Sequence, residues 1–243
     1  MEKILAKDRT HVVETPSITN ESAAAISRLA ALASLAAAAL FLVLLALLHV
    51  IKPEFDPSWR FISEYAIGNQ GWLMIVAFFA LALSCASLGI AIRSEVRTTS
   101  GKIGLALLIV VAVTLILAGV FVADPITATK EELTTHGTLH GLAAMMGIPG
   151  LPIAAVLISR SLLRNPDWSS ARRLVRWTAH LTWISVAFMF GSMFVMLSQT
   201  QGKFGPSVLI GWPNRFVVLT YCAWLMAVGW RAFQLSNRRI LNA

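Results

Sequence analysis

Two histidines four residues apart are the strongest chemical signal in this sequence of 243 residues. His136 and His140 lie in the segment TTHGTLHG, at residues 134–141. On a helix this spacing places both imidazoles on one face, where they could hold one zinc ion. The segment lacks the glutamate of the HExxH zinc proteases, so a catalytic base would have to come from elsewhere. A structural role, with the rings bonded to loop carbonyls, is the alternative.

Three other side chains could supply a base or a further ligand. Glu64 and Asp124 are candidate catalytic carboxylates, and the Ser63 hydroxyl could act as an oxygen ligand or donate a hydrogen bond to an oxyanion. Both carboxylates have simpler explanations. Arg60 stands four residues before Glu64 and could form an ion pair with it. Asp124, directly before a proline, could end one helix or cap the next.

Residues at the ends of two apolar stretches are candidates for substrate binding. Tyr65 closes the segment DPSWRFISEY, residues 56–65, which predicts a short helix capped by Asp56 at the outer membrane surface. Asn214 and Arg215 stand at the start of the last apolar stretch, where the arginine could hold a lipid phosphate or a substrate carboxylate. Anchoring to lipid headgroups explains Arg215 equally well.

The elements that must position these residues are membrane-spanning helices. The chain is 57% hydrophobic and 13% charged, with a mean hydropathy of +0.72, whereas about a quarter of a typical soluble domain is charged. This composition excludes a soluble enzyme, a disordered chain and a disulfide-stabilised secreted module. Uncharged stretches of about 20 residues, the length that crosses a bilayer, lie within residues 28–52, 64–93, 102–124, 132–160 and 176–203, with a weaker sixth at 213–235.

We therefore predict an all-α, polytopic membrane protein, a bundle of six transmembrane helices with a short outer interfacial helix. The expected organisation is a flexible cytoplasmic tail at residues 1–28, the transmembrane domain at 29–236 and a second cytoplasmic tail at 237–243. In the fourth helix, Pro149 and Pro152 predict a bend that could open a cavity below the histidines, although close helix packing at the neighbouring glycines explains the same segment.

The distribution of basic residues predicts the orientation. With six spans, 15 of the 20 lysines and arginines fall on the side that holds both termini. By the positive-inside rule this side is cytoplasmic, and the protein is expected in the cell inner (plasma) membrane. The net charge of +8 therefore encodes topology and does not indicate a nucleic-acid partner. Six of the 12 acidic residues lie on the opposite, outer side, where the chemistry is expected.

At the outer motifs the chain resembles a bacterial and archaeal family of six-helix membrane proteins catalogued as domain of unknown function 998. The resemblance covers residues 25–235 and rests on four short motifs: ISEYAIG at residues 62–68, Asp124-Pro125, THGTLHG at residues 135–141, and WPNR at residues 212–215. It implies the six-helix fold. It implies no reaction, because the family has no established one.

A looser similarity is to ceramidase-like transmembrane hydrolases, which combine a serine, an aspartate and histidines around a zinc ion. Ser63, Asp124, His136 and His140 supply comparable residue types on one membrane side. This chain has six predicted spans where those enzymes have seven, and its histidine pair lies in the fourth span where theirs lies in the last. His49 could act as a third histidine only if the first helix packs beside the fourth.

Two hypotheses follow for the function. In the first, the outer site is a lipid-directed hydrolase, with a possible zinc ion on His136 and His140 that activates water for attack on a lipid ester or amide. The alternative is a non-catalytic protein that binds or transports a lipid or small solute. The lack of an evident inverted repeat weakens its transporter form. Membrane lipids are the expected partners in both cases, and the sequence leaves the oligomeric state open.

Overall fold

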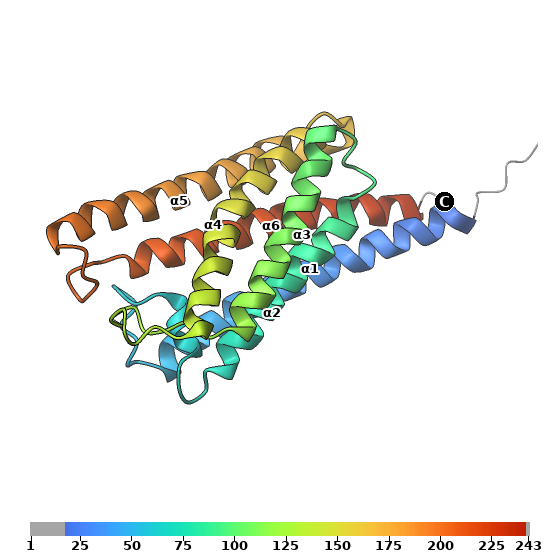
Figure 1. The fold of residues 1–243 in the computed structure, drawn as a ribbon. Helices are drawn as coiled ribbons and strands as arrows, with labels where there is room; N and C mark the ends of the chain where they lie inside the picture. The colour runs from blue at the N-terminus through green and yellow to red at the C-terminus, as the bar shows by residue number, and fades with distance from the viewer. Residues whose placement is uncertain (1–17, 242–243) are drawn as a thin grey trace, which may run out of the picture.

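The computed structural model describes residues 18–241, and these confirm the all-α architecture with six helices long and apolar enough to span a membrane (Figure 1). The spanning helices are α1 (Ile18–Ile51), α2 (Trp72–Ile92), α3 (Thr99–Val120), α4 (Thr135–Leu162), α5 (Arg172–Gln199) and α6 (Gly211–Leu241). Two short 3-10 helices lie in connections: η1 (Ile62–Ala66) between α1 and α2, and η2 (Pro166–Ala171) between α4 and α5.

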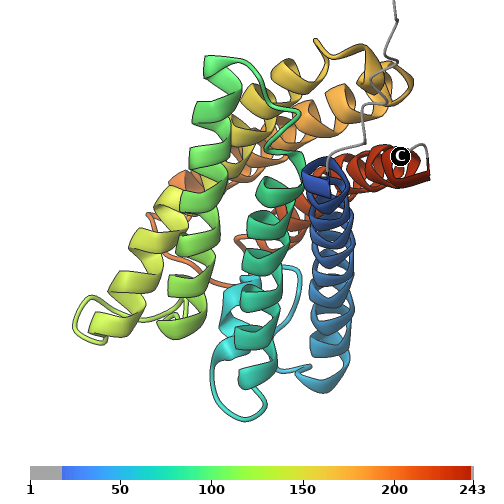
Figure 2. The ribbon, with the colours of Figure 1, turned by 90° about the vertical axis from the view of Figure 1, so that its right-hand side faces the viewer.

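The six helices pack largely in chain order. Each helix packs against the next one along the chain, and α6 returns to pack against α1. The start of α1 and the end of α6 lie on the same side of the bundle (Figures 1 and 2). We call that side the η2 end, because it also carries η2. The opposite side, the η1 end, carries η1 and the α3–α4 and α5–α6 loops.

The helices differ in how much of their surface the bundle encloses. In the most apolar window of both α2 and α6, 67% of the residues are buried, whereas in α5 the share is 22%. In a membrane protein, exposed apolar side chains of this kind face the hydrocarbon of the bilayer. Helices α2 and α6 therefore form the centre of the fold, and α5 lies at its periphery.

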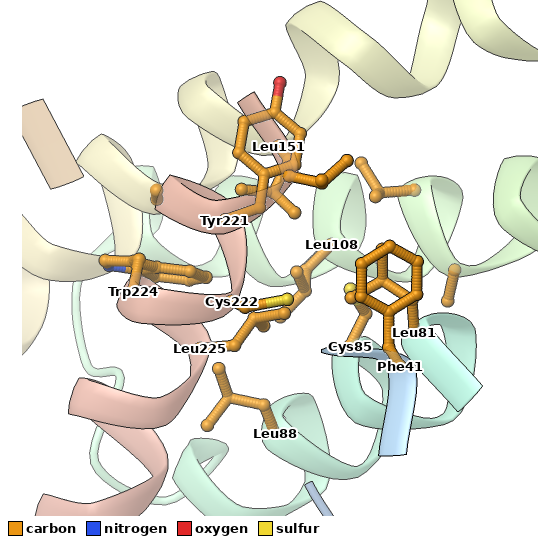
Figure 3. Close-up of a cluster of buried hydrophobic side chains, with 14 of the residues drawn as sticks. Phe41, Leu81, Cys85, Leu88, Leu108, Leu151, Tyr221, Cys222, Trp224 and Leu225 are labelled. Atoms are coloured by element: carbon orange, nitrogen blue, oxygen red, sulfur yellow. The ribbon is translucent and has the colours of Figure 1, made fainter. Parts of the chain in front are cut away.

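A cluster of apolar side chains from all six helices forms the centre of the bundle, and Figure 3 shows part of it. Its fully buried members include Phe41 of α1, Leu81 of α2, Leu108 of α3, Leu151 of α4 and Trp224 of α6. Cys85 and Cys222 are free thiols buried in the same cluster, as expected for small apolar residues.

The outermost helices extend further than the predicted membrane domain. Helix α1 begins at Ile18, so residues 18–28 of the expected tail are helical, and residues 1–17 lie outside the described part of the chain. No glycine or proline interrupts residues 18–51, which allows one continuous helix. Helix α6 runs to Leu241, and its Arg239 forms an ion pair of 2.5 Å with the buried Glu95 beyond the end of α2.

The predicted interfacial helix over residues 56–65 is only partly present. Asp56 does accept a hydrogen bond of 2.8 Å from the Ser58 amide, but residues 57–59 form a turn. Regular structure starts at Ile62, where η1 begins. Pro57, directly after the capping residue, is compatible with a turn as well as with a first helical position, which explains the difference.

Helix α4 stays continuous through its two prolines because another helix satisfies a carbonyl that one of them frees. Pro152 has no amide hydrogen to donate to Ile148, four residues earlier. The Tyr221 hydroxyl of α6 donates a hydrogen bond to that carbonyl. Figure 3 shows the hydroxyl pointing out of the apolar cluster. The proline thus fixes a polar contact between α4 and α6.

We expect Tyr221→Phe to lower the free energy of unfolding by about 1 kcal/mol, because it leaves the Ile148 carbonyl unpaired. Thermal unfolding in detergent measures the effect. In a Pro152→Ala background the amide of residue 152 can donate to Ile148 again, so the same substitution should cost less. Equal losses in both backgrounds would contradict this pairing.

Candidate functional site

A cavity of about 670 Å³ lies in the half of the bundle nearest the η1 end. All six helices, η1 and the loops of that end contribute to its wall, which is mainly apolar. Its size and composition are typical of small-molecule binding pockets, which are mostly apolar with a few polar groups. Of the predicted site residues, Ser63, Glu64, Asp124, His140 and Asn214 line it.

Glu64 is buried and fully engaged in hydrogen bonds. One carboxylate oxygen lies 2.7 Å from Arg60 Nη1 and 2.9 Å from the Ile126 amide, and the other accepts from the Phe61 amide at 3.0 Å. The pairing of Arg60 with Glu64 is therefore present, and the Ile126 contact ties η1 to the α3–α4 loop. Burial raises the pKa of the Glu64 carboxyl, and the bond from Ile126 and the Arg60 charge oppose the rise.

Asp124 organises the start of α4. Its carboxylate accepts hydrogen bonds of 2.8 Å from both the amide and the hydroxyl of Thr134, the residue that caps the helix. A Cβ atom at Gly137 would lie only 1.9 Å from Asp124 Oδ2, so the carboxylate rests directly on the first helical turn. A negative charge at this position also stabilises the helix dipole. These contacts match the capping role considered for Asp124.

The two histidines occupy different surroundings. His140 is buried, and its Nδ1 lies 3.1 Å from the Ala118 carbonyl and 2.9 Å from the Phe121 carbonyl. Since carbonyls only accept, Nδ1 carries a proton, and in the neutral ring Nε2 is left as an acceptor. His136 is exposed and makes an edge contact with the Phe121 ring.

The donors predicted for a zinc ion have other contacts in the structure. Within residues 18–241, no group of three or more histidine, cysteine, aspartate or glutamate side chains is placed to hold a metal. The Glu64 and Asp124 oxygens already accept hydrogen bonds, and His140 bonds to carbonyls as in the structural alternative. The catalytic and metal roles of these residues stay predictions.

Arg215 is buried at the η1 end among neutral acceptors. Its Nη1 donates to the carbonyls of Arg60 at 2.8 Å and Gly211 at 3.0 Å, and its Nη2 donates to the Tyr65 hydroxyl at 3.0 Å. Its Nε lies 2.7 Å from His49 Nε2. Among the ion pairs of the described residues, none includes Arg215.

The contact with Arg215 defines the proton position of His49. The guanidinium can only donate, so His49 Nε2 accepts and the ring proton lies on Nδ1, 2.6 Å from the Leu45 carbonyl. His49 is thus joined to α6, and α1 packs between α2 and α6. Arg215 and Tyr65 do not line the cavity.

The side chains of Asn214 and Ser63, two further predicted site residues, differ in their hydrogen bonding. The Asn214 side chain accepts from the Ile62 amide at 3.0 Å and so fixes the start of η1 against α6. The Ser63 hydroxyl lines the cavity and has no hydrogen-bond partner within residues 18–241. Of these two, Ser63 is the one available to a ligand.

Comparison with known families agrees with this architecture. Residues 35–231 match the family described as protein of unknown function (DUF998). This chain belongs to the DUF998 family. No curated protein and no solved structure matches it. The match confirms the resemblance, and it includes every site residue of this DUF998 protein described above.

One buried cation at the η1 end was not among the predicted site residues. Lys52, counted there only as an orientation charge, is 1% exposed, and its ammonium donates to the Tyr65 carbonyl at 3.0 Å and to the Ile67 carbonyl. Burial lowers its pKa, and the nearby Glu54 opposes this. A lysine directly after an apolar span was the available signal, because its long stem can turn back over the helix end. In this DUF998 protein Lys52 therefore holds the C-terminal end of η1.

We expect Arg215→Ala to destabilise the protein by about 3 kcal/mol, since it leaves buried acceptors on α1, α6 and the η1 segment unpaired. Arg215→Lys should recover little, because an ammonium cannot reproduce the planar fork of donors. The apparent melting temperature in detergent reports both effects. Lys203→Ala, an exposed cation at the same end, is the matched control, and a loss equal to that of Arg215→Ala would refute the specific role.

Proposed function

We propose that this DUF998 protein binds a membrane lipid, with a hydrocarbon chain in the cavity and the polar end of the lipid at the η1 end. The observation that carries the proposal is the mainly apolar cavity of about 670 Å³ inside a membrane-spanning bundle. Apolar side chains from α2, α3, α4 and α6 surround a space suited to a flexible chain; they include Phe78, Leu115, Leu151 and Val217. Binding there keeps the chain out of water.

The polar groups of the wall favour a particular class of headgroup. Glu64 and Asp124 line the cavity, and no lysine or arginine does. His140 offers an acceptor at Nε2, and Ser63 offers a hydroxyl without a partner among the described residues. Such a wall suits a hydroxyl or amine that donates hydrogen bonds, and it disfavours an anionic group near the two carboxylates.

The same contacts make binding a better-supported proposal than hydrolysis. A general base must be free to take a proton, but Glu64 and Asp124 are held by amides and by Arg60 or Thr134. The metal-assisted hydrolase rests on sequence alone and stays a prediction.

The charge distribution supports an orientation for the site. Of the 17 lysines and arginines within residues 18–241, 12 lie on the segments of the η2 end. We infer that the η2 end and both termini are cytoplasmic, that the η1 end faces outward, and that the protein resides in the cell inner (plasma) membrane.

The proposed ligand class is tested with three probes of equal chain length: hexadecanol, hexadecylamine and hexadecanoic acid. Native mass spectrometry of the purified protein in detergent measures binding. We expect the alcohol and the amine to bind, and the acid to bind at least ten-fold more weakly because of the carboxylates. Absence of binding by all three, or tightest binding by the acid, would contradict the proposal.

A substitution on α4 tests where the chain lies. Ala144 lines the cavity, and Leu139 on the same helix is exposed and does not. We expect Ala144→Trp to weaken hexadecanol binding at least ten-fold by filling the cavity, and Leu139→Trp to leave it unchanged. Equal effects of the two variants would show that the chain binds elsewhere.

Single cysteines test the orientation. Ser207 in the α5–α6 loop and Ser170 in η2 are exposed, and the native thiols are buried. On intact cells a membrane-impermeant maleimide should label Ser207→Cys at once, and Ser170→Cys only after permeabilisation. The reverse pattern would overturn the inferred topology.

A further inference from the structure

The cavity meets the lipid-exposed surface between two helices. Helices α4 and α5 lie close at the η2 end, where η2 joins them, and diverge toward the η1 end (Figures 1 and 2). The cavity wall includes Gly141 and Ala144 on α4 and Phe190 and Met193 on α5. The same space is therefore bounded by the facing sides of two helices that separate at this level.

The half of α5 nearest the η1 end is barely enclosed by the protein. Gly191 and Val195 are exposed, and the Phe194 side chain is 78% exposed. On α4, Met145 is 74% exposed, while Ala143 is buried at 4%. Neighbouring residues of α4 thus face different surroundings: Met145 faces the hydrocarbon of the bilayer, and Ala143 faces the inside of the bundle.

Gly141 lies at this transition and leaves space open. It is exposed, it lines the cavity, and a Cβ atom built on it would meet no atom within 4 Å. Gly191 on α5 is also exposed with nothing within 4 Å, but it does not line the cavity. Both glycines are therefore exposed and leave open space, but only Gly141 lies in the cavity wall.

At the η1 end, hydrogen bonds of the α3–α4 loop hold the cavity closed, in contrast to the space between α4 and α5. The hydrogen bond from the Ile126 amide to Glu64 joins the α3–α4 loop to η1, and the Asp124–Thr134 bonds hold the same loop on α4. A lipid arriving from water would have to break these contacts and expose its chain to water. A lipid arriving from the bilayer would do neither.

We propose that the ligand is a lipid of the surrounding leaflet that passes sideways from the bilayer into the cavity, between α4 and α5 at the level of Gly141. The inference rests on the proposed function and adds the source of the ligand and its route. A second copy of this chain packed on the α4–α5 face is the competing occupant, and it would close that route.

The test uses protein reconstituted in phosphatidylcholine vesicles that contain hexadecanol bearing a photoactivatable diazirine. Brief illumination at increasing times, followed by mass spectrometry of peptides, gives the rate at which adducts appear on cavity-lining segments. We expect Gly141→Trp to slow this rate at least ten-fold by blocking the opening, and Gly191→Trp to leave it unchanged. Equal rates in the two variants would overturn the lateral route.

A reversible block separates the route from an effect on folding. Gly141→Cys modified with a benzyl methanethiosulfonate should load slowly, and removal of the label with a reductant should restore the wild-type rate in the same sample. Gly191→Cys is the control. Continued slow loading after reduction would contradict the proposal, as would unmodified Gly141→Cys loading as slowly as its labelled form.

The outcomes distinguish failure of the route from failure of the proposed function. If the unmodified protein gives no adducts on cavity segments at any time, the cavity does not bind lipid and the proposed function fails. If it gives adducts at a rate that Gly141 substitutions do not change, binding stands and the lateral route is wrong. Protein–protein crosslinks through α4 and α5 in place of lipid adducts would identify the second copy as the occupant and overturn the route.

Discussion

The η1 end of this protein is organised around the buried guanidinium of Arg215, which forms no ion pair with a carboxylate of residues 18–241. Arg215 donates to His49 on α1, to the Arg60 carbonyl before η1 and to the Tyr65 hydroxyl within it. A charge enclosed in an apolar bundle is costly unless every donor finds an acceptor. The surrounding chain therefore has to place its oxygens and one imidazole nitrogen at this point, and that requirement locks α1, η1 and α6 together.

The locked segment then organises the opposite wall of the cavity. Arg60, whose carbonyl binds Arg215, uses its side chain to hold Glu64, and Glu64 accepts from the Ile126 amide across the bundle. Polar groups at this end thus bond mostly to one another. Among the residues that line the cavity, Ser63 and the Nε2 atom of His140 keep a free polar atom, which gives an apolar cavity a small capacity for hydrogen bonding.

The predictions made from residue patterns succeeded where local physics decides the outcome. Six uncharged stretches sufficed for six spanning helices, because no other continuous structure satisfies its own backbone in hydrocarbon. The four-residue spacing of Arg60 and Glu64 led to the observed ion pair. The histidine spacing did not predict the contacts of the two rings. A shared helix face does not determine whether a ring binds a metal or, as for His140, contacts the carbonyls at the end of α3.

The sequence by itself determined the membrane class, the number of spans and the family, because composition, span length and short motifs are properties of the chain read in order. Only the tertiary structure decided what Lys52, Tyr221 and Arg215 do, because their partners lie on other helices or beyond a turn. The size and the lining of the cavity could not be predicted from the sequence either. A cavity is the space that packed helices fail to fill, and its volume depends on how α4 and α5 diverge, which no single segment encodes.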